Sequence, residues 1–240
     1  MSKNAKLLLD MENASIDAAS GLWDVGVTDA TLRLCSGELA LVWLEPRHPR
    51  HPLPDLARGL VSPTSGSVRI QTMEWTALSA DEAAAARGRI GHGFGGVGFL
   101  SNLNVDENIT LPLRYHARLS SAAARDRAME WAHFFGWESL PAERPAWVSP
   151  ETLQVAQWIR AFSGKPDLLV LDRPCEGCSD ELAARFADAV AQECCRGAAA
   201  LWLIPGGRKV SGKTLSAATV SLRCQGPLLQ ADVSQTGACK

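Results

Sequence analysis

The chain has 240 residues, of which 46% are hydrophobic and 21% charged, and its formal net charge is -2. This balance is typical of a globular protein and excludes a strongly basic surface for nucleic acid. No apolar run approaches the roughly 20 residues that a membrane-spanning helix needs. Near the amino terminus, Leu7 to Leu9 is too short for a secretion signal. We therefore expect a cytoplasmic protein without direct membrane insertion.

Seven cysteines are an odd number for a chain without an export signal, and we expect reduced thiols. Cys175 and Cys178 form a C-x-x-C motif, and Cys194 and Cys195 are adjacent. A structural zinc site usually needs a second such pair or histidines at ligand spacing, and no histidine follows His133. Small buried hydrophobic side chains are the main interpretation, and a metal site is the minor alternative.

The predicted elements begin with a buried strand over Glu38–Leu44. An irregular stretch with four prolines and two histidines follows, over residues 45–54. A turn at Ser62–Gly66 then leads into a short strand over Val68–Thr72. These breaks indicate a strand, a loop and a second strand, with no convincing linker between domains.

The second half alternates helices with strands. One helix places Ala124, Ala128, Trp131 and Phe135 on one face and ends at Gly136. Two more helices begin at the capping residues Ser149 and Ser179, and apolar strands are expected at residues 168–171, 198–204 and near 220–222. This alternation predicts an α/β fold with a mostly parallel sheet, whose ligands usually lie at the carboxyl ends of the strands.

Five segments, in this order and at this spacing, resemble the nucleotide-binding domain of ATP-binding cassette (ABC) transporters over nearly the whole chain. They are Gly37-Glu38-Leu39, Gly59-Leu60 followed by Pro63-Thr64-Ser65-Gly66, Arg89-Ile90-Gly91 with Phe94 and Glu107-Asn108-Ile109, Arg160-Ala161, and Pro166 to Pro174. Leu111-Pro112-Leu113 and Tyr115-His116 further resemble cassettes of bacterial lipid-trafficking transporters, a weaker similarity.

The resemblance implies a single cassette over residues 1–240, with the P-loop NTPase type of fold. Its mostly parallel core sheet would carry N-terminal antiparallel strands, and a helical subdomain would be inserted at about residues 96–165. In this family the helical subdomain and the neighbouring loop form a cleft for a transmembrane subunit. Apolar material for that cleft is expected from Phe94, Val97, Phe99, Leu100 and Leu103, although core packing explains each of them equally well.

The residues that would bind the nucleotide depart from the family pattern. A P-loop wraps backbone amides around phosphates and supplies a lysine and a hydroxyl. Here Leu44 and Pro49 replace the glycines, Arg50 replaces the lysine and His51 replaces the hydroxyl. Proline has no amide hydrogen to donate, and residues other than glycine rarely adopt the left-handed turns of such a loop.

The other motifs are altered as well. Gly95 stands at the Q-loop glutamine, and Glu151 follows the retained Ser149 in the signature helix. Asp172 is retained as the expected magnesium ligand, but Arg173 occupies the position of the catalytic glutamate. Arginine cannot act as a general base. Ser179 stands at the D-loop aspartate, and Pro205-Gly206-Gly207 occupies the place of the switch histidine.

These losses predict a non-catalytic cassette subunit that docks a transmembrane subunit and possibly a second cassette on the inner face of the cell membrane, perhaps for lipid transport. In this interpretation nine positions are vestigial parts of a nucleotide site: Leu44, Pro49, Arg50, His51, Gly95, Ser149, Glu151, Asp172 and Arg173. No catalytic residue, metal site or cofactor is expected. One alternative is an active ATPase that binds ATP and magnesium, and another is an anion sensor that uses Arg47, Arg50 and Arg173.

A second segment, Gly207 to Thr214, matches the P-loop pattern letter for letter and follows a predicted strand. We expect no helix after it, because the stretch 215–224 is short and contains β-branched residues. Gly226-Pro227 then breaks any helix. The sequence therefore favours a basic loop here over a phosphate site.

Overall fold

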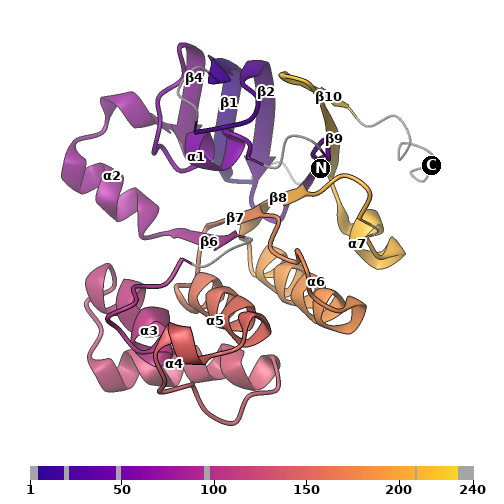
Figure 1. The fold of residues 1–240 in the computed structure, drawn as a ribbon. Helices are drawn as coiled ribbons and strands as arrows, with labels where there is room; N and C mark the ends of the chain where they lie inside the picture. Colours follow the sequence, from indigo (N-terminus) through magenta and orange to yellow (C-terminus); the bar gives the residue numbers. More distant parts are fainter. Residues whose placement is uncertain (1–4, 19–21, 47–49, 95–97, 209, 232–240) are drawn as a thin grey trace.

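The computed structural model describes residues 5–18, 22–46, 50–94, 98–208 and 210–231 (Figure 1). Ten strands within these ranges form one sheet in the order β5-β4-β1-β2-β10-β9-β3-β8-β7-β6. Their bounds are β1 Leu7–Ile16, β2 Val27–Cys35, β3 Leu39–Trp43, β4 Ser65–Ile70, β5 Met73–Glu74, β6 Ile90–Phe94, β7 Leu168–Asp172, β8 Ala199–Ile204, β9 Val220–Gln225 and β10 Leu228–Ala231.

The sheet has a parallel half and an antiparallel half. Strands β9, β3, β8, β7 and β6 are parallel neighbours, whereas β1 pairs antiparallel with both β2 and β4. A single parallel pairing, Leu228 with Thr28, joins the two halves through β10 and β2. This arrangement confirms the predicted mostly parallel core and the N-terminal antiparallel strands.

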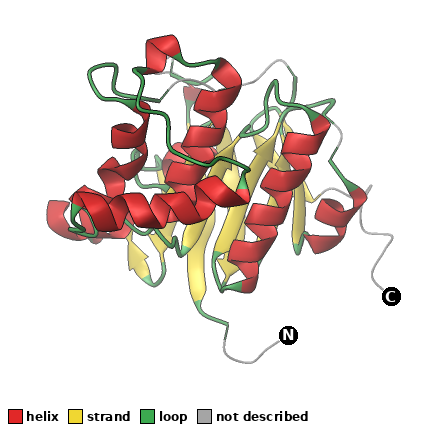
Figure 2. Ribbon diagram, turned by 90° about the horizontal axis from the view of Figure 1, so that it is seen from below, coloured by secondary structure: helices red, strands yellow, loops and turns green. Residues whose placement is uncertain are grey.

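The helices cover the sheet and form a separate group beside its parallel edge (Figures 1 and 2). Helices α3, α4 and α5 pack on one another at the β6 end, and α6 packs along β8. The helix bounds are α1 Leu53–Ala57, α2 Ala80–Arg87, α3 Val105–Tyr115, α4 Ser121–Phe134, α5 Pro150–Ser163, α6 Asp180–Cys195 and α7 Gly212–Ala217, with short 3-10 turns at Trp75–Ala77 and Pro145–Trp147. The subdomain limits of about 96–165 remain a prediction.

Aromatic side chains hold α4, α5 and α6 together. The rings of Trp131 and Phe162 stack with centroids 4.7 Å apart, and those of Trp158 and Phe186 lie 4.6 Å apart. Phe186 also meets Trp202 of β8 edge to face, so the cluster reaches the central sheet. Because aromatic pairs add to the free energy gained by burial, this cluster fixes the helices against the carboxyl end of β7.

Most predicted elements are confirmed within one or two residues. Serine side chains at Ser149 and Ser179 accept hydrogen bonds from the first turns of α5 and α6, and Gly136 ends α4 with a φ of +87°. Strand β4 begins at Ser65, inside the predicted turn. In the described part of the chain, no helix has the length and apolar composition needed to cross a bilayer.

Candidate functional site

The loops that follow β3 and β8 pack directly against each other. The amide of Leu44 donates a 2.8 Å hydrogen bond to the carbonyl of Ile204, which continues the pairing beyond β3. A Cβ atom at Gly206 would lie 2.6 Å from the Leu44 carbonyl oxygen and 2.6 Å from Cδ of Pro46. Only glycine fits at position 206, because the backbone of one loop lies against the other. Pro49 and Arg47 lie outside the described residues.

Arg50, which replaces the P-loop lysine, is bound to Asp24. Its Nε and Nη2 atoms donate to Asp24 Oδ1 at 3.0 and 2.6 Å, and its amide donates to Asp24 Oδ2 at 2.8 Å. The Asp24 amide donates in return to the Arg50 carbonyl at 3.0 Å. The hydrogen bond and charge of Asp24 raise the pKa of Arg50. A phosphate would have to compete with this carboxylate for the guanidinium group.

His51 is buried, and its ring is used inside the protein. Nδ1 accepts a 3.3 Å hydrogen bond from the amide of Leu53, and Nε2 lies 3.4 Å from Sγ of Cys224 in β9. Since Nδ1 accepts from an amide, the proton of the neutral ring lies on Nε2. Position 51 therefore stabilises the start of α1 and its contact with β9, and it does not present a donor at the carboxyl end of β3.

Asp172 and Arg173 form an ion pair at the carboxyl end of β7. Arg173 Nε donates to Asp172 Oδ1 at 3.2 Å, and Arg173 Nη1 donates to Glu176 Oε2 at 3.1 Å. Burial raises the pKa of Asp172, although the charge of Arg173 acts in the opposite direction. Arg173 has a φ of +49°, and its amide donates to the Leu203 carbonyl, so its backbone is fixed by β8. The carboxylate expected to bind magnesium thus has an internal cation as partner.

Ser149 and Glu151 form an ordinary helix start. The Ser149 hydroxyl accepts from the Thr152 amide at 3.2 Å and lies 2.9 Å from the Thr152 hydroxyl. Glu151 is exposed in the first turn of α5, where a negative charge favours the helix. The same carboxylate would repel an approaching phosphate. Gly95, at the Q-loop position, lies outside the described residues.

The fold of the whole chain is similar to that of solved structures. The chain superposes on the dimeric ATP-binding cassette MJ0796, in a post-hydrolysis state bound to ADP and Pi, with a TM-score of 0.76 over 92% of this chain and 96% of that chain. Sequence identity is 17%. The chain has the fold of an ATP-binding cassette. No protein-family model matches the sequence.

The curated relatives are named as ATP-binding proteins. The methionine import ATP-binding protein MetN 1 of Bacillus cereus is 33% identical over 113 residues, which is 47% of this chain and 32% of that protein. The lipoprotein-releasing system ATP-binding protein LolD of Psychrobacter arcticus is 30% identical over 120 residues, 50% of this chain and 53% of that protein. MetN 2 of Bacillus thuringiensis is 30% identical over 76% of this chain and 53% of its own length. The matches thus span about a third to a half of the relatives.

The fold brings only part of the predicted site together. Asp172 and Arg173 are in direct contact, whereas Arg50 is bound to Asp24 and His51 lies against Cys224. The anion-sensor alternative relied on Arg47, Arg50 and Arg173. Arg50 and Arg173, the two that the structure describes, each bind a carboxylate of the same chain. In the described part of the chain, no group of three or more histidine, cysteine, aspartate or glutamate side chains could hold a metal ion.

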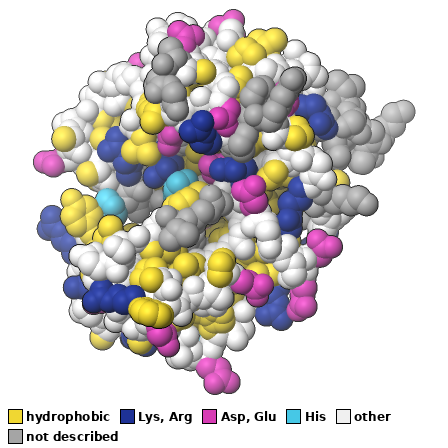
Figure 3. Space-filling model, in the orientation of Figure 1, with side chains coloured by type: hydrophobic (Ala, Val, Ile, Leu, Met, Phe, Trp, Pro, Cys, Tyr) yellow, Lys and Arg dark blue, Asp and Glu magenta, His cyan; other side chains and the backbone are white. Residues whose placement is uncertain are grey.

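A basic cleft lies between α2, β6 and α3. The sequence predicted a cleft with apolar residues but not its basic lining. Its cavity of about 510 Å³ is lined by Arg58, Arg87, Arg160, His92 and His116, and the described lining contains no carboxylate. Figure 3 shows Lys and Arg side chains gathered with histidine around a hollow on this side of the molecule. Of the expected apolar residues, Phe94 and Leu100 line the cleft, Phe99 packs beneath Arg160, and Val97 lies outside the described residues.

Two of the three arginines of the cleft donate to backbone carbonyls. Arg160 donates to the Gly98 carbonyl and Arg87 to the Gly59 carbonyl, both at 2.7 Å, while Arg58 lies 3.9 Å from Asp55. Burial lowers the pKa of Arg160 to about 10 and brings the pKa of His92 well below 6.5. Arg160 lies in one of the segments that carried the resemblance, but its position beside two other arginines depends on the fold.

The second P-loop-like segment corrects one expectation. A short helix begins within it: α7 runs from Gly212 to Ala217, and the Ser211 hydroxyl accepts from the Thr214 amide as its cap. Ser211 is a strong capping residue, and the β-branched Thr219 and Val220 lie beyond the end of this six-residue helix. Lys213 nevertheless pairs with Asp188 at 2.5 Å, and the Thr214 hydroxyl lies 2.8 Å from that of Ser211. The groups that would bind phosphate and magnesium contact the protein itself.

Proposed function

We propose that this chain is a non-catalytic cassette subunit of a membrane transport complex, which docks a transmembrane subunit and possibly a second cassette. The observation that carries the proposal is the ion pair between Arg173 and Asp172. It replaces the expected base with a group that cannot accept a proton, and it gives the expected magnesium ligand a cation from its own chain.

Magnesium and ATP fit this site poorly. A metal ion at Asp172 would have to displace the guanidinium of Arg173, and a phosphate at the loop after β3 would have to compete with Asp24 for Arg50. The contact of Gly206 with Leu44 and Pro46 also brings two loops together where a P-loop encloses its phosphates. These contacts support the prediction that the subunit needs no nucleotide cofactor.

The basic cleft supports a docking role on the inner face of the membrane. Its three arginines are half-buried, the described lining contains no carboxylate, and within the described ranges only Arg58 has an acidic neighbour, Asp55 at 3.9 Å outside the lining. A partner segment that carries acidic side chains would supply the missing negative charge, and charge complementarity of this kind favours specific association. We propose that this segment belongs to a transmembrane subunit. The name of LolD describes lipoprotein release, whereas the names of the MetN relatives concern methionine import.

The alternative function is an active, ATP-hydrolysing transporter subunit. It is favoured by the relatives, whose names describe ATP-binding proteins, and by the ADP and Pi bound to MJ0796. This alternative requires the Arg173–Asp172 and Arg50–Asp24 pairs to open when nucleotide binds. The two functions therefore differ in what Arg50 and Arg173 do in the presence of ATP.

Equilibrium binding of labelled ATP to the purified chain, with and without magnesium, separates the two functions. We expect no magnesium-dependent binding and no ATP turnover. Arg173→Ala and Arg50→Ala should leave any residual turnover unchanged, because such turnover would come from a contaminant. Turnover that either substitution abolishes would overturn the proposal. For docking, Arg160→Glu should prevent copurification of a transmembrane subunit, while the surface substitution Arg114→Glu serves as a matched control.

A further inference from the structure

The turn between β7 and α6 carries two cysteines at C-x-x-C spacing that the proposed function does not use. The amide of Cys178 donates to the carbonyl of Cys175 at 3.4 Å, and Gly177 between them has a φ of +79°. Such a closed turn keeps the Cα atoms of its first and last residues within about 7 Å. A disulfide requires a similar separation, about 4.4–6.8 Å. The backbone thus already brings the two side chains within reach of each other.

The two thiols have different surroundings. Cys175 is buried, with 4% of its surface exposed, whereas Cys178 is partly exposed at the residue before the cap of the 16-residue helix α6. Arg208 Nη2 lies 3.7 Å from Cys178 Sγ and donates to the Cys178 carbonyl at 3.4 Å. A hydrogen bond from Cys175 and the charge of Arg208 lower the pKa of Cys178 to about 7, while burial raises that of Cys175. Cys178 Sγ donates to the Cys175 carbonyl at 3.2 Å, so a partly exposed thiol whose pKa is lowered lies beside a buried thiol.

Side chains from α5 hold the turn in this conformation. Gln154 Nε2 donates to the carbonyls of Pro174 and Glu176 at 2.9 and 3.0 Å, and Trp158 Nε1 donates to the Pro174 carbonyl at 3.1 Å. These bonds fix the residues on both sides of Cys175. The geometry of the pair is thus built into the fold rather than left to a free loop.

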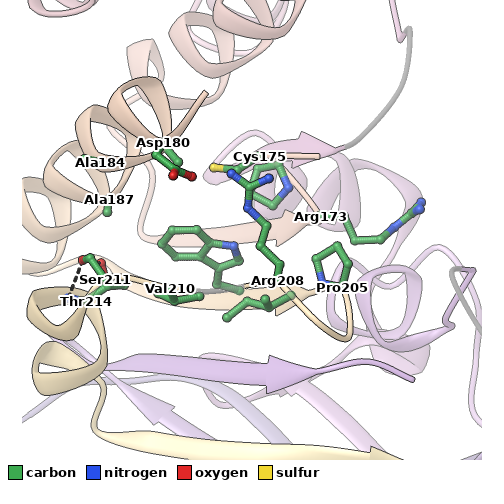
Figure 4. Close-up of a pocket in the computed structure, with 14 residues that line it drawn as sticks. Arg173, Cys175, Asp180, Ala184, Ala187, Pro205, Arg208, Val210, Ser211 and Thr214 are labelled. Carbon is green, nitrogen blue, oxygen red and sulfur yellow. Dashed lines mark hydrogen bonds between the residues drawn. The ribbon is translucent and has the colours of Figure 1, made fainter. Parts of the chain in front are cut away.

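A cavity of about 280 Å³ opens beside Cys175 (Figure 4). Apolar atoms of Ala183, Ala187 and Trp202 line it, together with Arg208 and the carboxylate of Asp180. Arg208 and Cys175 approach each other in this view. Such a cavity suits a small, partly apolar molecule, and Arg208, which also contacts Cys178, would pair with a carboxylate of that molecule.

We propose that Cys175 and Cys178 form a thiol–disulfide exchange site for low-molecular-weight disulfides that carry carboxylates. The thiolate of Cys178 attacks one sulfur of the small disulfide, forms a mixed disulfide and releases the other half as a thiolate. Cys175 then loses its proton to solvent, attacks Cys178 Sγ and releases the second half, which takes up a proton. One protein dithiol and one small disulfide thus become one protein disulfide and two small thiols. The inference does not rest on the proposed function.

Glutathione disulfide is the probe for this site, applied to the full reduced chain and followed by peptide mapping of every cysteine. We expect the chain to lose two hydrogens and to yield a Cys175–Cys178 disulfide. Cys175→Ser should stop at a mixed disulfide on Cys178, and Cys178→Ser should leave Cys175 unreacted. Arg208→Gln should slow the reaction severalfold, while Cys194→Ser, in the adjacent pair on α6, serves as the matched control.

Alkylation with iodoacetamide gives an independent measurement that does not depend on any variant. Because Cys175 and Arg208 lower the pKa of Cys178, a larger fraction of it is ionised at pH 7 than the few per cent of an ordinary thiol with a pKa of about 8.5. The lower nucleophilicity of a more acidic thiol offsets part of this gain, so we expect Cys178 to react faster than an ordinary exposed cysteine, although by less than the ratio of the ionised fractions. A mixed disulfide that persists on the unmodified chain, oxidation at another cysteine pair, or alkylation of Cys178 no faster than that of exposed Cys195 would each overturn the proposal.

Discussion

Replacement of Arg173 by alanine tests the ion pair on which the proposed function depends. The substitution removes the guanidinium that contacts Asp172 at 3.2 Å and leaves the carboxylate in a poorly solvated position. Both side chains are largely covered, with 15% and 20% of their surfaces exposed. The pair therefore belongs with partly buried charges rather than with exposed ion pairs, whose contribution is about 0–1 kcal/mol.

We expect Arg173→Ala to lower the free energy of unfolding by about 2 kcal/mol at pH 7. A hydrogen bond between charged groups contributes about 1.5–3 kcal/mol, and loss of one partner leaves a carboxylate that must be desolvated without compensation. Alanine meets the same steric resistance as arginine at a φ of +49°, so backbone strain does not account for the change.

The effect should depend on pH in a defined direction. Burial already raises the pKa of Asp172 above its ordinary 3.8. Loss of Arg173 removes the charge that counteracts this shift, so the folded pKa rises further in the variant. Below pH 3.8, Asp172 is protonated in both the folded and the unfolded chain, and the variant should be as stable as the parent. The destabilisation should grow as the pH rises through the folded pKa.

Urea unfolding followed by tryptophan fluorescence, at pH 7 and again at the lowest pH where the chain remains folded, measures this difference. Arg173→Lys keeps the positive charge and should recover part of the loss at pH 7. Glu176→Gln removes only the more exposed partner and should change the free energy of unfolding by less than about 0.5 kcal/mol. Equal destabilisation by Arg173→Ala at both pH values, or a lysine variant as unstable as the alanine variant, would refute the reasoning.

Three further outcomes are expected. Lys213→Ala should leave nucleotide binding unchanged and shift stability by less than about 0.5 kcal/mol in urea unfolding, because the Lys213–Asp188 pair is exposed; a loss of ATP affinity would contradict this. Phe186→Ala should cost about 3–5 kcal/mol in the same assay, because it empties the centre of the aromatic cluster, whereas Phe186→Leu should cost less. Glu151→Gly with Thr152→Gln should raise the ATPase rate of a complex with an active cassette, measured by phosphate release, because it removes a like charge; P-loop restoration alone should not.

The sequence predicted those elements whose signals are local. Ser149 followed by Pro150 marks a helix start whatever surrounds it, and the run Leu168 to Leu171 reads as a buried strand by itself. The start of β4 at Ser65 was missed because pairing with Ser15 of β1 extends the strand into a segment with turn-forming residues. Helix α7 was missed because its signal is a single residue. The capping serine Ser211 starts a helix of only six residues, Gly212–Ala217.

The candidate site was less predictable because its contacts join distant residues. The order of motifs identified positions 50, 51, 172 and 173, but their partners could not be read from spacing. Arg50 meets Asp24 across 26 residues, and His51 meets Cys224 across 173. Only the Arg173–Asp172 contact lies between neighbours, and even there the left-handed backbone of Arg173 decides that the two side chains meet.

The bonds from Gln154 and Trp158 to the turn after β7 have a mechanical consequence. Both side chains belong to α5, which packs in one group with α3 and α4, while the turn continues directly from the central sheet. A rotation of this helical group relative to the sheet must therefore either carry the turn with it or break three hydrogen bonds. Movement of the helical group would therefore be transmitted to the segment that holds Arg173 and both cysteines.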